Sequence, residues 1–95
     1  MNKQIKIRLN NQLPFLRKTY HVKKIGIFGS FARGDQTKAS DIDILVEFKK
    51  PIGLFNFIKL EDFLSQTLHK KVDLVSKKAL KPTIKKDILK EVIYV

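Results

Sequence analysis

The chain has 95 residues, a formal net charge of +11, no cysteine, and 43% hydrophobic against 31% charged residues. This length and balance predict one folded domain over residues 1–95 rather than a disordered tail. The lack of cysteine excludes disulfides, thiolate metal sites and a cysteine nucleophile. Apolar runs are far shorter than the ~20 residues of a membrane helix, and lysines interrupt the N-terminal segment. We therefore expect a cytoplasmic protein with no membrane partner.

The positive charge is spread unevenly along the chain. Residues 1–24 hold seven basic and no acidic residues, residues 25–48 hold two basic and four acidic, and residues 49–95 hold eleven basic and five acidic. Basic surface attracts phosphates, acidic proteins or nucleic acid, or is simply solvated. Because the lysines are scattered, with few aromatic residues between them and no known RNA- or DNA-binding motif, direct nucleic-acid binding is disfavoured.

Hydrophobic periodicity predicts a helix in the first part of the chain, followed by two strands. The helix extends from near Ile5 to Tyr20, and Pro14 is expected to kink or restart it. The first strand covers residues 22–28, and residues 30–34 form a helical turn or a tight loop. The second strand, residues 42–48, alternates apolar residues on one face with mainly acidic residues on the other.

The second half of the chain predicts an amphipathic helix over residues 54–68, a strand over 71–76 and a last helix that starts at Pro82. Glu61 lies within the apolar stripe of the first of these helices, where we expect an ion pair at the edge of the core. The apolar faces expected to be buried are Leu54, Phe57, Ile58, Leu64 and Leu68 in one helix, and Ile84, Ile88, Leu89 and Val92 in the other. The order of elements predicts an α/β (α+β) fold: a short mixed β-sheet packed against helices.

Gly29 and Ser30 stand where the first strand gives way to the turn. Glycine lets a ligand approach the backbone closely, and the following N–H groups with the serine hydroxyl can hold an anion. On its own this pair is more typical of an ordinary turn.

Asp41 and Asp43 stand at the start of the second strand. Residues i and i+2 of a strand project from the same face, roughly 6–7 Å apart. Two carboxylates so placed repel each other unless a cation lies between them, and Mg²⁺ takes oxygen ligands that substrate phosphates complete. The alternative is a solvated acidic face.

The two features together have a more specific meaning. Nucleotidyl transfer requires a turn that binds phosphate and a pair of carboxylates on the next strand, and here ten residues separate the two. The turn holds the β- and γ-phosphates, and metal ions bridge phosphates and carboxylates. Asp73, in the alternating strand 71–76, is the candidate third carboxylate, to help deprotonate the acceptor or to hold a second metal ion. Its alternative is an ion pair with a nearby lysine.

These motifs carry a resemblance to a known family. The segments Gly29-Ser30-Phe31-Ala32-Arg33-Gly34-Asp35 and Ser40-Asp41-Ile42-Asp43-Ile44-Leu45-Val46-Glu47-Phe48 are similar to the core of the minimal nucleotidyltransferases. This group, MNT, belongs to the DNA polymerase β-like superfamily and often supplies the antitoxin of HEPN–MNT toxin–antitoxin pairs. The resemblance extends through the strand around Asp73 to residues 93–95, and thus covers nearly the whole chain.

The resemblance implies a single-domain nucleotidyltransferase fold and a set of roles. Gly29, Ser30 and Arg33 would bind the nucleotide, while Asp41, Asp43 and Asp73 would be the catalytic, Mg²⁺-binding carboxylates. The implied activity is transfer of AMP from ATP to a hydroxyl of a partner protein. The acceptor would be a tyrosine of a cognate HEPN-type ribonuclease toxin, which the transfer would silence.

A different class of function stays open. The chain could be an antitoxin-type binding protein that neutralises its partner by complex formation without catalysis. The intact Gly-Ser and Asp-x-Asp motifs favour the enzyme. The acceptor residue, the number of AMP units added, the base preference and the homo- or hetero-oligomeric state are not predicted by the sequence.

Overall fold

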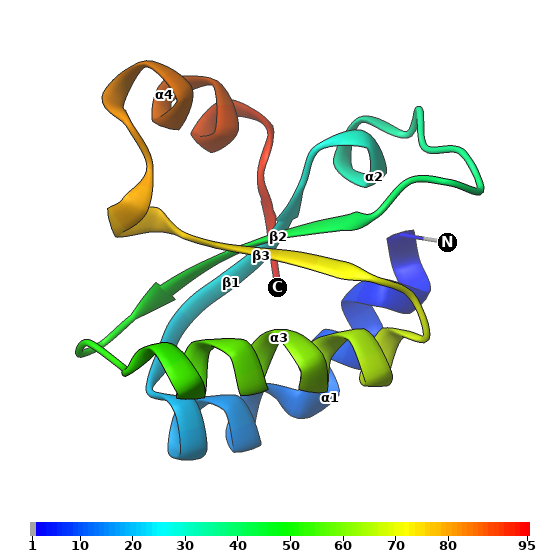
Figure 1. The fold of residues 1–95 in the computed structure, drawn as a ribbon. Coiled ribbons are helices and arrows are strands. Elements are labelled where there is room, and N and C mark those ends of the chain that lie inside the picture. Colours follow the sequence, from blue (N-terminus) through cyan, green and yellow to red (C-terminus); the bar gives the residue numbers. More distant parts are fainter. Residues whose placement is uncertain (1) are drawn as a thin grey trace.

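The computed structural model describes residues 2–95, which form a sheet with helices on both faces (Figure 1). Helices α1 and α3 cover one face of the sheet, α4 lies on the other, and the short helix α2 directly follows the end of β1. The helices are α1 (Asn2–Tyr20), α2 (Ser30–Arg33), α3 (Leu54–Leu68), the 3₁₀ turn η1 (Lys77–Ala79) and α4 (Pro82–Glu91). The strands are β1 (Val22–Phe28), β2 (Ile42–Phe48), β3 (Val72–Ser76) and β4 (Ile93–Tyr94).

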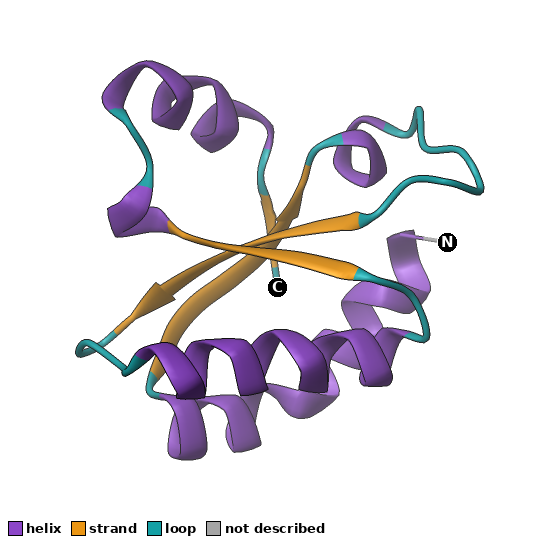
Figure 2. Cartoon of the chain, viewed as in Figure 1, coloured by secondary structure: helices purple, strands orange, loops and turns teal. Residues whose placement is uncertain are grey.

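The sheet is mixed, in the order β3-β2-β1-β4 (Figure 2). Strand β1 pairs antiparallel with both β2 and β4, whereas β2 and β3 are parallel and are connected through α3. Such a parallel pair needs a crossover connection, which the amphipathic helix supplies. The predicted α+β architecture with a short mixed sheet is therefore confirmed, and β4 is an addition that periodicity could not show.

The main core lies between the sheet and helices α1 and α3. Ile42, Ile44 and Val46 of β2 are almost completely buried in it, as the alternation predicts. Phe31 of α2 is 1% exposed and belongs to the same core. On the other face, Leu45 packs in a smaller cluster with Phe28 and Ile88 of α4. The two faces of β2 therefore pack against two separate hydrophobic clusters.

Three helix expectations need correction. Helix α1 continues through Pro14 as one helix from Asn2 to Tyr20 instead of restarting there. In α3 the buried side chains are Leu60, Leu64 and Leu68, while Leu54 and Ile58 are 71% and 45% exposed. The first turns of α3 therefore present part of the predicted stripe to solvent.

In α4 the predicted apolar face is also covered only in part. Ile88 is buried and Val92 is half-buried, but Ile84 and Leu89 are 52% and 37% exposed. The cluster beneath α4 is small, so it covers one turn of the helix rather than the whole stripe.

Side chains of α3 cover the exposed edge of β3. The backbone N–H of Leu74 donates to Oε2 of Glu61 at 2.9 Å, and that of Val72 donates to the Ser65 hydroxyl at 3.0 Å. An uncovered edge strand carries unpaired N–H groups that invite association with another chain. Glu61 is therefore a backbone acceptor, not the ion-pair partner that its position predicts.

Glu61→Ala is expected to destabilise the protein by about 1–3 kcal/mol, because the Leu74 N–H group then loses its partner in a half-buried place. Glu61→Gln keeps an acceptor oxygen and should cost less. Chemical denaturation measures both, with the exposed neighbour Asp62→Asn as control. Equal stability of Glu61→Ala and the control would refute this role.

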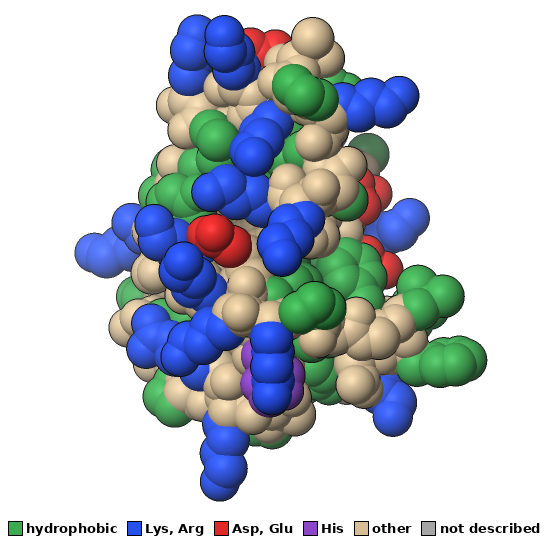
Figure 3. All heavy atoms as spheres, turned by 90° about the vertical axis from the view of Figure 1, so that its left-hand side faces the viewer, with side chains coloured by type: hydrophobic (Ala, Val, Ile, Leu, Met, Phe, Trp, Pro, Cys, Tyr) green, Lys and Arg blue, Asp and Glu red, His purple; other side chains and the backbone are tan. Residues whose placement is uncertain are grey.

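On the face drawn in Figure 3, the basic side chains are dispersed rather than gathered in one stripe. Lysine and arginine side chains lie from top to bottom of this face, with hydrophobic groups between them. No helix within residues 2–95 has the length and apolarity to span a membrane.

Candidate functional site

The sequence motifs meet on the face of the sheet that α2 and α4 flank. Gly29 directly follows β1, Asp43 is the second residue of β2, and Asp73 is the second residue of β3. Asp43 is opposite Phe28 in the antiparallel pair and beside Asp73 in the parallel pair. Because β2 lies between the other two strands, the fold brings all three motifs to one place. The sheet order explains why residues that the sequence analysis selected as candidates lie close together.

Gly29 adopts a backbone conformation that other residues avoid. Its φ of 72° and ψ of −151° lie in a region almost restricted to glycine. A Cβ atom built on it would overlap the Asp43 carboxylate, lying 3.0 Å from the Asp43 Cγ. The turn that opens α2 and the carboxylate of β2 are therefore in direct van der Waals contact.

Asp43 lies in an unfavourable electrostatic environment. Partial burial raises its pKa first, and the neighbouring carboxylates of Asp73 and Asp41 raise it further, while Arg33 acts in the opposite direction. Asp41, whose side chain is 44% exposed, forms an ion pair with Lys71 at 3.9 Å. Burial and the neighbouring carboxylates therefore both disfavour the charged form of Asp43.

Arg33 and Glu91 form a link that the sequence analysis missed. Arg33 Nη1 donates to both carboxylate oxygens of Glu91, at 3.3 and 3.2 Å, and Arg33 Nε donates to Asp35 at 3.2 Å. The backbone N–H of Gly29 also donates to Glu91 Oε1, at 2.9 Å. Glu91 is 62 residues from Gly29 in the chain, so no local pattern indicates the contact.

The donor set is suited to a cation that takes only part of its ligands from protein. Within the described residues 2–95, no three His, Cys, Asp or Glu side chains converge closely enough to enclose a metal ion. Mg²⁺ is ordinarily bound through one or two carboxylates together with substrate phosphates and water. A cation bound here would offset the repulsion between Asp43 and the neighbouring carboxylates of Asp73 and Asp41.

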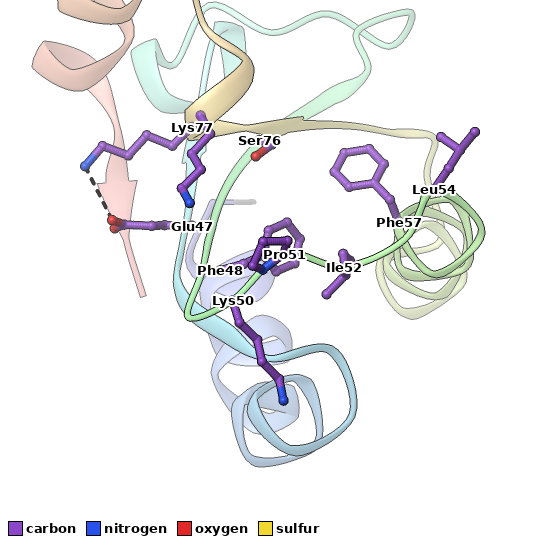
Figure 4. A pocket seen from close by; sticks show the side chains of 10 residues that line it. Glu47, Phe48, Lys50, Pro51, Ile52, Leu54, Phe57, Ser76 and Lys77 are labelled. Carbon is purple, nitrogen blue, oxygen red and sulfur yellow. Dashed lines mark ion pairs between the residues drawn. The ribbon is translucent and has the colours of Figure 1, made fainter.

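A separate hollow of about 300 Å³ lies at the opposite ends of β2 and β3 (Figure 4). Phe48 and Ser76, the last residues of these strands, line it together with the start of α3. Glu47 at its margin pairs with Lys77 at 3.7 Å. Because Asp43 and Asp73 are at the beginnings of the same strands, this apolar hollow is distinct from the carboxylate site.

The comparison with protein families shows the family to which the chain belongs. The model of the family described as "Nucleotidyltransferase domain" matches residues 8–95. The chain belongs to the nucleotidyltransferase domain family. This confirms the resemblance that the Gly-Ser and Asp-x-Asp segments carry.

Relatives place this nucleotidyltransferase beside protein-modifying enzymes. A Methanocaldococcus jannaschii protein whose name proposes protein adenylyltransferase activity is 52% identical over 93 residues, covering 97% of this chain and 95% of that protein. The protein adenylyltransferase MntA of Thermococcus cleftensis is 48% identical over 80 residues, 84% of this chain and 81% of that protein.

Solved structures share the fold. One, described as a candidate minimal nucleotidyltransferase, has a TM-score of 0.83 and 30% identity and covers 96% of this chain and 92% of its own. A toxin–antitoxin structure with AMP-PNP has a TM-score of 0.75 and 26% identity, covering 90% of this chain and 69% of that one. A Shewanella oneidensis complex of a tri-AMPylated HEPN toxin with an MNT antitoxin shares the fold alone. Its TM-score is 0.73 at 19% identity, over 99% of this chain and 71% of that one.

Proposed function

We propose that residues 1–95 act as one minimal nucleotidyltransferase domain that transfers AMP from ATP to a hydroxyl group of a partner protein. The observation that carries the proposal is the register of the sheet, which pairs Asp43 with Asp73 beside the glycine turn of Gly29. The names of relatives up to 52% identical support protein as the acceptor.

Each residue of the site has a proposed role. Gly29 and Ser30 bind the triphosphate through the N-terminal turn of α2, and Arg33 offers its guanidinium to a phosphate. Asp41 and Asp43 would hold Mg²⁺ together with the phosphates of ATP, and Asp73 is the third carboxylate of the site. Mg²⁺, when bound, neutralises charge on the phosphates as it develops in the reaction.

The reaction forms one bond and breaks another at the α-phosphorus of ATP. The acceptor oxygen attacks in line, its bond to phosphorus forms, and the bond to the β-phosphate oxygen breaks, releasing pyrophosphate. The proton of the acceptor hydroxyl must leave, and Asp73 is exposed on β3 beside Asp43, where it can accept that proton. Its alternative role is to complete the metal site.

The proposed acceptor is a tyrosine of a cognate HEPN-type ribonuclease toxin, so that the protein acts as an antitoxin in the cytoplasm. In the Shewanella oneidensis complex of similar fold, a HEPN toxin carries AMP groups beside an MNT antitoxin. The second candidate function is neutralisation by contact alone. It is less favoured because the chain keeps a partly buried Asp43 beside the like-charged Asp73 and Asp41, an unfavourable arrangement that binding to a protein does not require.

The double variant Asp41→Asn/Asp43→Asn separates these functions. In cells that express the cognate toxin, we expect the variant to lose neutralisation while it still binds the toxin in pull-down assays. A variant that neutralises as well as the wild type would establish the contact mechanism instead. Asp62→Asn, an exposed change of the same kind on α3, is the control and should neutralise normally.

A further inference from the structure

Glu91 occupies the groups that the proposed function assigns to phosphate. Its Oε1 accepts the backbone N–H of Gly29 at 2.9 Å, and both of its oxygens accept from Arg33 Nη1. The Glu91 side chain is 28% exposed and that of Arg33 is 50% exposed. A carboxylate from the last residue of α4 therefore binds where an anionic ligand is expected.

Glu91 and a phosphate oxygen cannot use the Gly29 N–H at the same time. A backbone amide has one hydrogen, and a short, well-aligned bond serves one acceptor. The same holds for the Nη1 hydrogens of Arg33 that point to Glu91. Binding of a triphosphate at these donors requires the Glu91 carboxylate to leave them.

Charge acts in the same direction as geometry. Glu91 lies close enough to Asp43 to be among the groups that raise its pKa. A polyphosphate placed on Gly29 and Arg33 would add several negative charges to this region, and like charges a few ångströms apart repel strongly at partly buried positions. The Glu91 side chain would then move away from the site.

The geometry points to Glu91 as a residue of the nucleotide site: an internal substitute for phosphate that holds Gly29 and Arg33 in the free protein and competes with the triphosphate of ATP. This inference rests on the proposed function, because that function assigns Gly29 and Arg33 to the triphosphate. It predicts that Glu91 lowers the affinity of the site for polyphosphates. If Glu91 were only an anchor for these two residues, its removal would weaken binding.

Isothermal titration calorimetry with Mg²⁺·ATP, and separately with Mg²⁺·pyrophosphate, tests the inference. The deciding result is whether the affinity rises or falls when Glu91 is replaced. Glu91→Gln removes the charge and is expected to bind both ligands about tenfold more tightly. Glu47→Gln is the matched control, since Glu47 is similarly exposed (23%) and also ion-paired, but lies near the other end of β2. It should bind both ligands like the wild type, which excludes an effect of net charge.

Glu91→Asp is a second variant should Glu91→Gln fail to fold. It keeps the charge on a side chain one methylene shorter, loses reach to Gly29, and should bind both ligands more tightly than the wild type by a smaller factor. Unchanged or weaker binding by the folded variants overturns the inference. The proposed function fails differently, through a wild-type chain that binds neither ligand or transfers no AMP.

Discussion

Asp43→Asn is expected to slow AMP transfer by about a thousandfold, since it removes a carboxylate that would hold Mg²⁺ against the phosphates. The same change should raise the melting temperature of the nucleotide-free protein. Burial and the carboxylates of Asp73 and Asp41 disfavour the charged form of Asp43, and asparagine removes that charge. Loss of activity with a gain in stability is typical of a residue retained for chemistry.

The stability effect has a defined pH dependence. The pKa of Asp43 is higher in the folded protein than in the unfolded chain, so the folded state binds the proton more tightly. Its contribution to stability is therefore most favourable at acidic pH and is lost as the pH rises through the folded-state pKa. The higher melting temperature of Asp43→Asn relative to the wild type should therefore be seen at pH 7, and the difference should shrink toward pH 3.

Thermal melts with and without Mg²⁺ and ATP, alongside an assay of AMP transfer, check both parts of this prediction. The ligands should stabilise the wild type more than Asp43→Asn, because binding to the native state raises its stability. Asp62→Asn serves as control. A variant that melts below the wild type without ligand, or that keeps its transfer rate, would contradict the role given to Asp43.

Gly29→Ala should produce the second large effect, a loss of about 3 kcal/mol of folding stability together with loss of nucleotide binding. Its backbone conformation is strained for any L-residue, and the added methyl would meet the Asp43 carboxylate. To relieve that overlap, either the turn that opens α2 or the side chain of Asp43 must move. Both are parts of the proposed site.

Gly34→Ala is the matched control for this prediction. Gly34 also has a positive φ, 80°, but a Cβ built on it meets no atom within 4 Å. Gly34→Ala should lower the free energy of unfolding by about 1 kcal/mol, because only the left-handed backbone conformation disfavours alanine there. Nucleotide binding should remain intact. Denaturation and titration of both variants with ATP give the comparison. Equal losses in the two would show that contact with Asp43 is unimportant.

The strands and helices that periodicity predicted well are those with one buried and one polar face. In β2 the apolar residues Ile42, Ile44 and Val46 meet the main core, and Leu45 packs against Ile88 of α4. Burial in the first turns of α3 was harder to predict, because Leu54 and Ile58 continue the apolar stripe but remain exposed. Periodicity shows which residues share a face, but not how far the neighbouring element extends.

The residues of the proposed site could be selected from local sequence patterns, whereas their contacts could not. Gly29, Asp41, Asp43 and Asp73 could be selected from local patterns, yet the pairing of Asp43 with Asp73 depends on the crossover through α3. Glu91 could not be selected at all. Its partners are 58 and 62 residues away, and its position at the end of α4 is ordinary for a glutamate.

Intact-mass spectrometry of the cognate HEPN-type partner, incubated with this protein, ATP and Mg²⁺, tests the central claim most directly. We expect the mass of the partner to increase by whole AMP units, with no increase when Asp43→Asn replaces the wild type, and fragmentation to place the AMP on a tyrosine. A partner of unchanged mass in a stable complex with the wild-type protein would contradict the account and establish neutralisation by binding.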